Sequence, residues 1–230
     1  FSSDASHELR TPLTVLKGQN ELVLSKPRDL KEYQEVIVSN LEEINYMSKV
    51  LEDLFILSKS DENQIHLNCK PMELRDLVEE VCKHAEVLAS DKDIRIIIAF
   101  LESVKINGDE VRLQQMIWNI LHNGYKYTQP GGELKVSLQD EGEFSLLSIQ
   151  DTGIGIPEKD LPSIFDRFYR VDKARSRHEG GRGLGLAICK YIVESHEGEI
   201  QVESQVGKGT KFRTRLPKVK ASITKGVSSS

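Results

Sequence analysis

Residues 6–13 read Ser-His-Glu-Leu-Arg-Thr-Pro-Leu (SHELRTPL), within an opening run that has the apolar spacing of a helix. A titratable pair, His7 and Glu8, stands one turn before a proline, Pro12. Proline lacks the N–H that would bond the carbonyl of Glu8, so the helix is bendable there. An adjacent carboxylate can hold the proton of one imidazole nitrogen and leave the other free as a nucleophile. For a lone His-Glu pair an exposed surface histidine is the better interpretation, but the proline and the motifs downstream favour a nucleophile.

Two helical patterns form the first part of the chain. The first ends at Lys26-Pro27, because proline cannot continue a helix, and the second runs from Leu30 to Leu54 with an apolar residue every three or four positions. Two amphipathic helices joined by a tight turn form a hairpin that is too small to bury its own apolar stripe. We therefore expect a homodimer in which two hairpins make a four-helix bundle, with His7 beside the seam and facing water.

The pattern changes after the polar stretch 61–64, which we interpret as a domain boundary. Helices are expected at residues 73–90, 109–127 and 184–196, and strands at 94–100, 133–139, 144–151, 199–203 and 210–216. Strands in antiparallel pairs with helices grouped apart indicate an α/β sandwich, so the fold class is α+β, a helical hairpin followed by that sandwich. The expected division is 1–62, 63–217 and a disordered tail, 218–230.

Composition narrows the classes of function. The 230-residue chain has a formal net charge of −5, which does not favour a nucleic-acid surface. Its three cysteines are far apart, which favours reduced cytosolic thiols over a disulfide framework or a metal site. The longest apolar run, Ile96–Leu101, is too short to cross a bilayer. Because the chain begins inside a motif, we expect it to be the C-terminal piece of a longer protein.

Residues 119–128 carry the first of three stretches with the chemistry of a nucleotide site. On a helix, Asn119, Asn123 and Lys126 share one polar stripe opposite an apolar face. An amide oxygen is a hard ligand suited to Mg²⁺, and the ammonium supplies charge for phosphate. An ordinary solvated helix face explains the same stripe.

Two glycine-rich stretches complete the set. Asp151 ends the apolar face of a strand and is followed by Gly153 and Gly155. A buried carboxylate needs a donor, which the amine of adenine could supply, although a simple Asp-Gly turn is an equally good interpretation. Residues 180–186 place glycines at a helix start, where free N–H groups suit phosphate. The charged loop before them, after residues 164–172, is expected to be a mobile lid.

Five motifs in this order resemble the catalytic core of a two-component sensor histidine kinase. They are the histidine box SHELRTPL (6–13), the asparagine box NILHNGYKYT (119–128), and the nucleotide boxes DTGIGI (151–156), FDRFYR (165–170) and GRGLGL (181–186). Each motif is a weak signal alone, whereas all five in sequence are a strong one. The resemblance implies a dimeric helical hairpin followed by an α/β sandwich of the gyrase, Hsp90 and histidine kinase type.

The resemblance also implies roles for the matched residues. His7 would be the phosphoacceptor, Glu8 its general base, Thr11 an orienter of water in dephosphorylation, and Arg170 a stabiliser of transferred charge. Asn123 would bind Mg²⁺. The implied nucleotide contacts are Asn119, Asn123, Lys126, Tyr127, Asp151, Gly153, Gly155, Gly181, Gly183, Leu184 and Gly185. Gly124 stands where the family more often has alanine, and we expect no loss from this. Histidines outside the motifs, among them His84 and His196, are expected to be solvated.

The function that the resemblance implies is ATP- and Mg²⁺-dependent autophosphorylation of His7. The phosphoryl group would pass to an aspartate of a response-regulator receiver domain, with phosphatase activity on that regulator. The chain would be the cytoplasmic portion of a membrane-bound sensor protein. Two alternatives stay open: an ATP-driven conformational machine like the gyrase and chaperone relatives, which lack the histidine box, and a nucleotide-binding scaffold or phosphatase-dominant relative.

Overall fold

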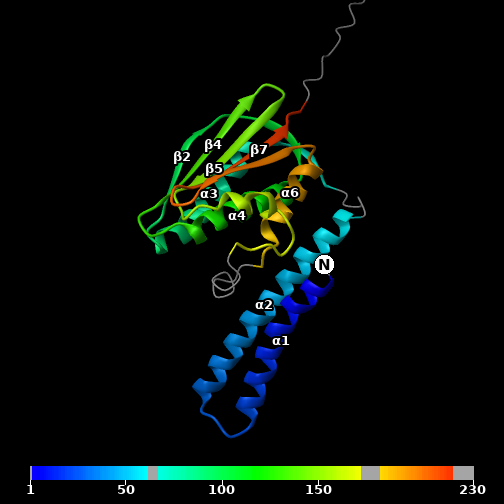
Figure 1. Ribbon diagram of the computed structural model, residues 1–230, viewed down its shortest axis with the longest axis vertical. Helices are drawn as coiled ribbons and strands as arrows, with labels where there is room; N and C mark the ends of the chain where they lie inside the picture. The colour runs from blue at the N-terminus through cyan, green and yellow to red at the C-terminus, as the bar shows by residue number, and fades with distance from the viewer. Residues whose placement is uncertain (1, 62–66, 172–181, 220–230) are drawn as a thin grey trace, which may run out of the picture. The chain divides into compact units, whose positions relative to one another are not determined.

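The computed structural model describes residues 2–61, 67–171 and 182–219 (Figure 1). The chain forms two compact units. The first, the hairpin unit, comprises Phe1–Ile65 and Ile164–Ile188, and the second, the sheet unit, comprises His66–Ser163 and Cys189–Ser230. Within the described ranges, no helix has the length and apolar character needed to span a membrane.

The hairpin unit is built on helices α1 (Ser2–Leu24) and α2 (Leu30–Asp61). Pro12 lies inside α1 without ending it. A capping box starts α2: the carboxylate of Asp29 accepts the N–H of Glu32 at 2.8 Å, and the carboxylate of Glu32 accepts the N–H of Asp29 at 3.2 Å. The predicted hairpin is confirmed, and this reciprocal pair stabilises the start of α2.

Apolar positions of the hairpin remain at the surface of a single chain. Leu13 on α1 and Ile37, Leu41 and Leu51 on α2 expose 57, 57, 54 and 53% of their surfaces. Fully burying such a side chain contributes roughly 1.5–3 kcal/mol. The isolated hairpin therefore leaves much of its hydrophobic free energy unrealised, as expected of a surface that pairs with a partner.

The sheet unit contains a five-stranded sheet with strand order β2-β4-β5-β7-β6 and a two-stranded sheet of β1 and β3. Its elements are β1 (Lys70–Glu73), α3 (Leu74–Asp91), β2 (Arg95–Leu101), β3 (Lys105–Gly108), α4 (Glu110–Tyr127), β4 (Glu133–Glu141), β5 (Phe144–Asp151), the 3₁₀ helix η1 (Glu158–Ser163), β6 (Glu199–Gln205) and β7 (Gly209–Pro217); α6 (Gly185–Ser195) begins in the hairpin unit. Figure 1 shows α3 and α4 along one face of the larger sheet. The expected fold class is confirmed.

One expectation about the sheet is wrong. Strands β4, β5, β7 and β6 pair antiparallel as expected, but β2 pairs with β4 in parallel, with Arg95 opposite Glu133. The chain between these two strands runs through β3 and α4, and such a crossover returns it in its original direction. The short strands β1 and β3 were not expected, because four residues are too few to display a two-residue period.

The first residues of the expected tail belong to the fold. The N–H of Lys218 donates to the carbonyl of Glu143 at 2.9 Å, and the N–H of Val219 donates to the carbonyl of Lys105 at 3.2 Å. These backbone bonds join the chain after β7 to the turn between β4 and β5 and to β3, beyond the predicted boundary. Residues 220–230 lie outside the described part of the chain.

Candidate functional site

His7 lies on α1 with its side chain exposed, as predicted. The hydroxyl of Thr11, one turn later, donates to the carbonyl of His7 at 3.4 Å. Pro12 leaves the carbonyl of Glu8 without its usual helical donor, since proline has no N–H. An exposed imidazole at this position is accessible to a reaction partner.

The carboxylate of Glu8 is held from two sides within the hairpin unit. Its Oε2 accepts a hydrogen bond from the hydroxyl of Tyr46, on α2, at 3.0 Å. Nη2 of Arg170 lies 2.9 Å from the same oxygen, with 7% of the arginine side chain exposed. Nε and Nη2 of Arg170 make no aligned hydrogen bond to any described residue, so the contact with Glu8 is an ion pair. Two residues with predicted catalytic roles, Glu8 and Arg170, are thus adjacent.

Three residues absent from the sequence prediction extend this cluster. The guanidinium carbon of Arg182 lies over the ring of Tyr46, 5.6 Å from the ring centroid. Nε of Arg182 lies 3.4 Å from Oδ2 of Asp53. Burial raises the pKa of the Tyr46 phenol to about 12, and the Glu8 carboxylate acts in the same direction. Burial also raises the pKa of the Asp53 carboxyl, against the lowering effect of Arg182. A carboxylate inside the apolar run of α2 was the signal that could have revealed this cluster.

Helix α4 carries the predicted asparagine stripe. Asp109 caps its start by accepting the N–H of Arg112 at 3.2 Å. The predicted apolar face is confirmed as buried: Leu113, Ile117, Ile120, Leu121 and Gly124. Asn119, Asn123 and Lys126 are half-buried on the other side of the helix. The ammonium of Lys126 lies 5.2 Å from the ring centroid of Tyr127.

Asp151 is buried at the end of β5, with 8% of its surface exposed. Its Oδ1 accepts the N–H of Gly153 at 2.8 Å and the N–H of Thr210 at 3.1 Å. Burial raises the pKa of this carboxyl above its ordinary value of 3.8, and the two backbone donors act against that rise. Oδ2 accepts no hydrogen bond from any residue that the structure describes.

The two glycines of the DTGIGI box (151–156) are packed against the protein's own backbone. A Cβ on Gly155, where φ is +70°, would lie 2.1 Å from the carbonyl oxygen of Gln205. A Cβ on Gly153 would lie 2.6 Å from the carbonyl oxygen of Tyr127. Real Cβ atoms do not approach so closely, so internal packing already requires glycine at both positions, whether or not a ligand approaches them.

The third nucleotide box is described only in part. Gly183 has φ of +71°, Leu184 is fully buried, and Gly185 begins α6, close to the predicted helix start. Residues 172–181, which include Gly181 and most of the expected lid, lie outside the described residues.

His196 is buried rather than solvated, so that prediction is wrong, whereas His84 is exposed as expected. Nε2 of His196 accepts the N–H of Asp109 at 3.0 Å, and Nδ1 lies 2.8 Å from the carbonyl oxygen of Ile192. These partners require a neutral ring with its proton on Nδ1. The histidine thus joins the end of α6 to the start of α4, a tertiary contact with no local sequence signal.

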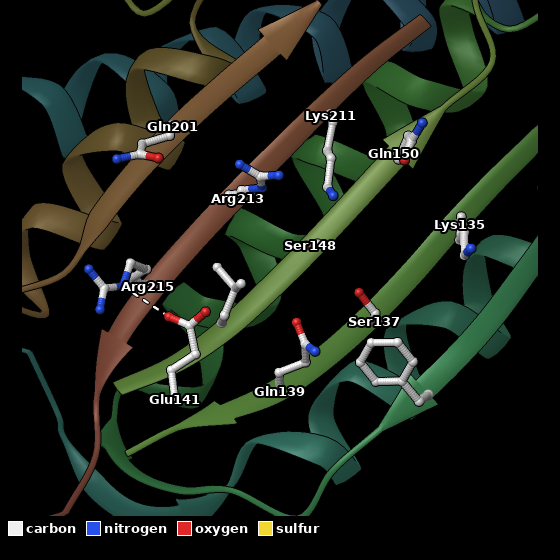
Figure 2. Close-up of a pocket in the computed structure, with 12 residues that line it drawn as sticks. Lys135, Ser137, Gln139, Glu141, Ser148, Gln150, Gln201, Lys211, Arg213 and Arg215 are labelled. Atoms are coloured by element: carbon white, nitrogen blue, oxygen red, sulfur yellow. Dashed lines mark ion pairs between the residues drawn. The ribbon is translucent and has the colours of Figure 1, made fainter. Parts of the chain in front are cut away.

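A shallow hollow of about 620 Å³ lies on the face of the large sheet that α3 and α4 leave open (Figure 2). Its polar lining follows from the two-residue period, since Ser137 pairs across the strands with Ser148, and Ser148 with Arg213. None of the predicted nucleotide-binding residues lines it. This hollow is therefore separate from the predicted nucleotide site.

No group of three or more histidine, cysteine, aspartate or glutamate side chains within the described ranges could hold a metal ion. Asn123 offers one amide oxygen. Mg²⁺ commonly takes one or two protein ligands and completes its shell with substrate phosphate oxygens and water, and this donor set fits that pattern.

Two family models match the chain. Residues 1–63 match the His Kinase A (phospho-acceptor) domain, and residues 108–220 match the histidine kinase-, DNA gyrase B-, and HSP90-like ATPase. Both matches contain the motifs described above, in the same order. The chain belongs to the sensor histidine kinases and contains their two-domain catalytic core, of which the second domain is an ATP-binding type.

Similar proteins extend over nearly the whole chain. Sensor histidine kinase CusS of Escherichia coli strain K12 is 38% identical over 217 residues, 94% of this chain and 45% of the relative. Sensor protein SrrB of Staphylococcus aureus strain N315 is 33% identical over 222 residues, 95% of this chain and 38% of the relative. The chain thus spans less than half the length of these curated relatives.

Solved structures of histidine kinases also match nearly the whole chain. The Acinetobacter baumannii histidine kinase AdeS superimposes with a TM-score of 0.75 and 27% identity, covering 92% of this chain and 98% of that one. Full-length ShkA, solved in complex with AMPPNP, superimposes with a TM-score of 0.73 and 27% identity, covering 94% of this chain and 45% of that one.

Proposed function

We propose that the protein phosphorylates itself on His7 with ATP as donor, and passes the phosphoryl group to an aspartate of a response-regulator receiver domain. The observation that carries this proposal is the held carboxylate of Glu8 beside an exposed His7. A neutral imidazole nitrogen attacks the γ-phosphorus, the bond from that phosphorus to the leaving oxygen of ADP breaks, and Glu8 accepts the imidazole proton. Catalysis then consists mainly of positioning and neutralisation of charge.

Asp151 is the adenine-reading residue in this proposal. Its Oδ1 is occupied by two backbone N–H donors, which orient the carboxylate and direct Oδ2 to accept the exocyclic amine. The stripe on α4, with Asn119 and Lys126, then contacts the phosphates, and Tyr127 follows at the helix end. Support comes from the match to an ATP-binding family and from a similar protein solved with AMPPNP.

Asn123 is the proposed protein ligand of Mg²⁺. When bound, the ion supplies positive charge to the phosphate oxygens and lowers the cost of charge movement during transfer. Arg170 is proposed to act on the same developing charge, because two nitrogens of its buried guanidinium make no aligned hydrogen bond to a described residue.

The partners follow from the hairpin. We infer that a second copy of the chain covers its exposed apolar positions, and that the receiver domain docks on the outer surface of the resulting bundle. Glu8 and Thr11 would support hydrolysis of the phosphorylated receiver. Residues 1–62 then serve dimerisation and phosphotransfer, and 63–217 bind the nucleotide. The proposal that this chain is the cytoplasmic portion of a membrane-bound sensor rests on its resemblance to the family.

The test is transfer of label from γ-labelled ATP with Mg²⁺ to the chain, compared with His7→Ala and with His84→Ala, an exposed histidine on α3. We expect an acid-labile adduct in the parent chain and in His84→Ala, and none in His7→Ala. Label that survives His7→Ala would identify another nucleophile. ATP binding without any label would favour the phosphatase-dominant or scaffold alternative.

A further inference from the structure

Tyr46 connects the two helices of the hairpin at the level of the phosphoacceptor. It projects from α2, and its hydroxyl donates to Oε2 of Glu8, on α1, at 3.0 Å. The two residues are 38 positions apart in the chain, so the contact depends on the hairpin being formed. Glu8 follows His7 directly in the sequence, and a base must lie within hydrogen-bond reach of the proton that it accepts, so the orientation of its carboxylate matters for proton transfer.

The tyrosine ring is itself held in place. The guanidinium of Arg182 lies 5.6 Å from the ring centroid, and that arginine is paired with Asp53, of which only 4% is exposed. An arginine over an aromatic face is attracted by the ring quadrupole. The phenol keeps its proton at physiological pH, since its ordinary pKa is 10.0 and burial and the Glu8 carboxylate raise that pKa further, to about 12. Tyr46 is thus a permanent donor on an anchored ring.

We propose that Tyr46 is a positioning residue that orients the carboxylate of Glu8 for proton transfer from His7. This inference rests on the proposed function, in which Glu8 is the base. The contact lies entirely between α1 and α2, so it does not require the ion pair between Glu8 and Arg170. If Arg170 leaves Glu8 to bind the transferred phosphoryl group, the tyrosine still holds the carboxylate in place.

The alternative is that Tyr46 only packs between the helices. The two roles depend on different parts of the side chain. Packing and the contact with Arg182 need only the ring, whereas positioning of Glu8 needs the hydroxyl. Tyr46→Phe removes the hydroxyl and keeps the ring. Tyr33→Phe is the matched control, since it makes the same change on the same helix at a tyrosine that is 37% exposed.

The experiment measures single-turnover labelling of the full chain at saturating ATP, together with the affinity for ATP and the melting temperature. We expect Tyr46→Phe to slow labelling by about 10- to 100-fold, with ATP affinity unchanged and the chain still folded at the assay temperature, because a hydrogen bond to a charged group is lost and the base is misplaced. Tyr33→Phe should label at the parent rate.

A double-mutant cycle with Glu8→Asp shows whether the tyrosine acts through the carboxylate. The shorter side chain keeps a base but withdraws it from the hydroxyl, so Tyr46→Phe should have little further effect on that background. The proposal is overturned if Tyr46→Phe labels within twofold of the parent, or if its loss is the same on both backgrounds. Absence of label in the parent chain would instead refute the proposed function, and this inference with it.

Discussion

The two units of the molecule differ in how far they bury their large apolar residues within a single chain. In the sheet unit, large side chains such as Leu113, Met116 and Leu134 are completely buried within one chain. In the hairpin unit, Leu13 and Ile37 each expose 57% of their surfaces. The sheet unit therefore contains its own core, whereas the stability of the hairpin should depend on association, and hence on protein concentration.

The same difference appears in how the two units hold their functional carboxylates. Backbone N–H groups of Gly153 and Thr210 fix Asp151, while side chains of Tyr46 and Arg170 contact Glu8. A carboxylate held by backbone groups is preorganised, because Thr210 lies within β7 and Gly153 is packed against the backbone of Tyr127. One held by side chains can change partners by rotamer changes alone. A ligand-reading residue suits the first arrangement, and a residue that takes part in proton transfer suits the second.

The largest expected effect concerns Asp151. Asp151→Asn should weaken ATP binding by at least about 100-fold, because the amide oxygen would keep the two backbone donors and the NH₂ group would face the amine of adenine. Titration calorimetry with ATP measures the loss. Retained affinity would show that this carboxylate does not read the base.

Stability should respond to Asp151→Asn in the opposite direction. Burial raises the pKa of Asp151, so the folded state binds its proton more tightly than the unfolded chain. The ionised carboxylate therefore opposes folding increasingly as the pH rises from its ordinary pKa of 3.8 through its raised pKa in the folded state. The variant lacks this cost, and its free energy of unfolding relative to the parent should increase across that range. Urea unfolding at several pH values measures the difference; a fall with rising pH would contradict it.

The next effect tests the hairpin. Ile37→Asp places a charge at an exposed apolar position of α2 and should weaken the dimer by at least about 100-fold, since burying an unpaired carboxylate is costly. Sedimentation equilibrium measures the dissociation constant of the dimer. Asn45→Asp, which adds the same charge at an exposed polar position of that helix, should leave it unchanged. If both variants dimerised equally well, Ile37 would not belong to the dimer interface, and the proposed dimer surface would be wrong.

Sequence patterns predicted most of this architecture for physical reasons. The bounds of β5 agree with prediction to the residue, because a strand buried on one face shows a clear two-residue period. The helix of the asparagine box was equally clear from its apolar face. The parallel pairing of β2 was not predictable in this way, since periodicity reports which face is buried and not the direction of the neighbouring strand.

The candidate site was predictable where its residues are adjacent in the chain. His7, Glu8 and Thr11 share one helical turn, and Asp151 lies two residues from one of its backbone donors. Contacts between distant segments were missed, as with the Tyr46 hydroxyl on Glu8 and the burial of His196 against the start of α4. Such contacts depend on tertiary geometry, which no local pattern encodes.

A smaller effect on stability separates two reasons for glycine in the sheet unit: a positive φ, and a steric clash between a Cβ and nearby backbone. Gly155 and Gly207 have similar positive φ values, +70° and +78°, but only Gly155 would bring a Cβ against backbone, at the carbonyl of Gln205. Substitution by alanine should therefore cost about 1 kcal/mol at Gly207 and about 2 kcal/mol or more beyond that at Gly155. Urea unfolding compares them; equal costs would mean that backbone conformation alone requires glycine.

The smallest effect compares one helical glycine from each unit. Gly18 on α1 has open space where a Cβ would stand, so Gly18→Ala should stabilise the chain by up to about 1 kcal/mol through helix propensity. At Gly124 on α4 the same gain is opposed, because the new Cβ would lie 2.5 Å from Cδ2 of the fully buried Leu134, which would have to shift. We expect Gly124→Ala to change stability by less than about 1 kcal/mol.

The Cβ of Asp151 would be in ordinary contact with that alanine, at 3.6 Å, so ATP affinity should remain within about twofold of the parent chain. Urea unfolding and calorimetry on Gly18→Ala and Gly124→Ala measure both quantities. If Gly124→Ala were stabilised as much as Gly18→Ala, the core beside Asp151 would be as adaptable as the open surface of the hairpin. A loss of affinity at Gly124 would instead show that the nucleotide site depends on the close approach of α4 to the sheet.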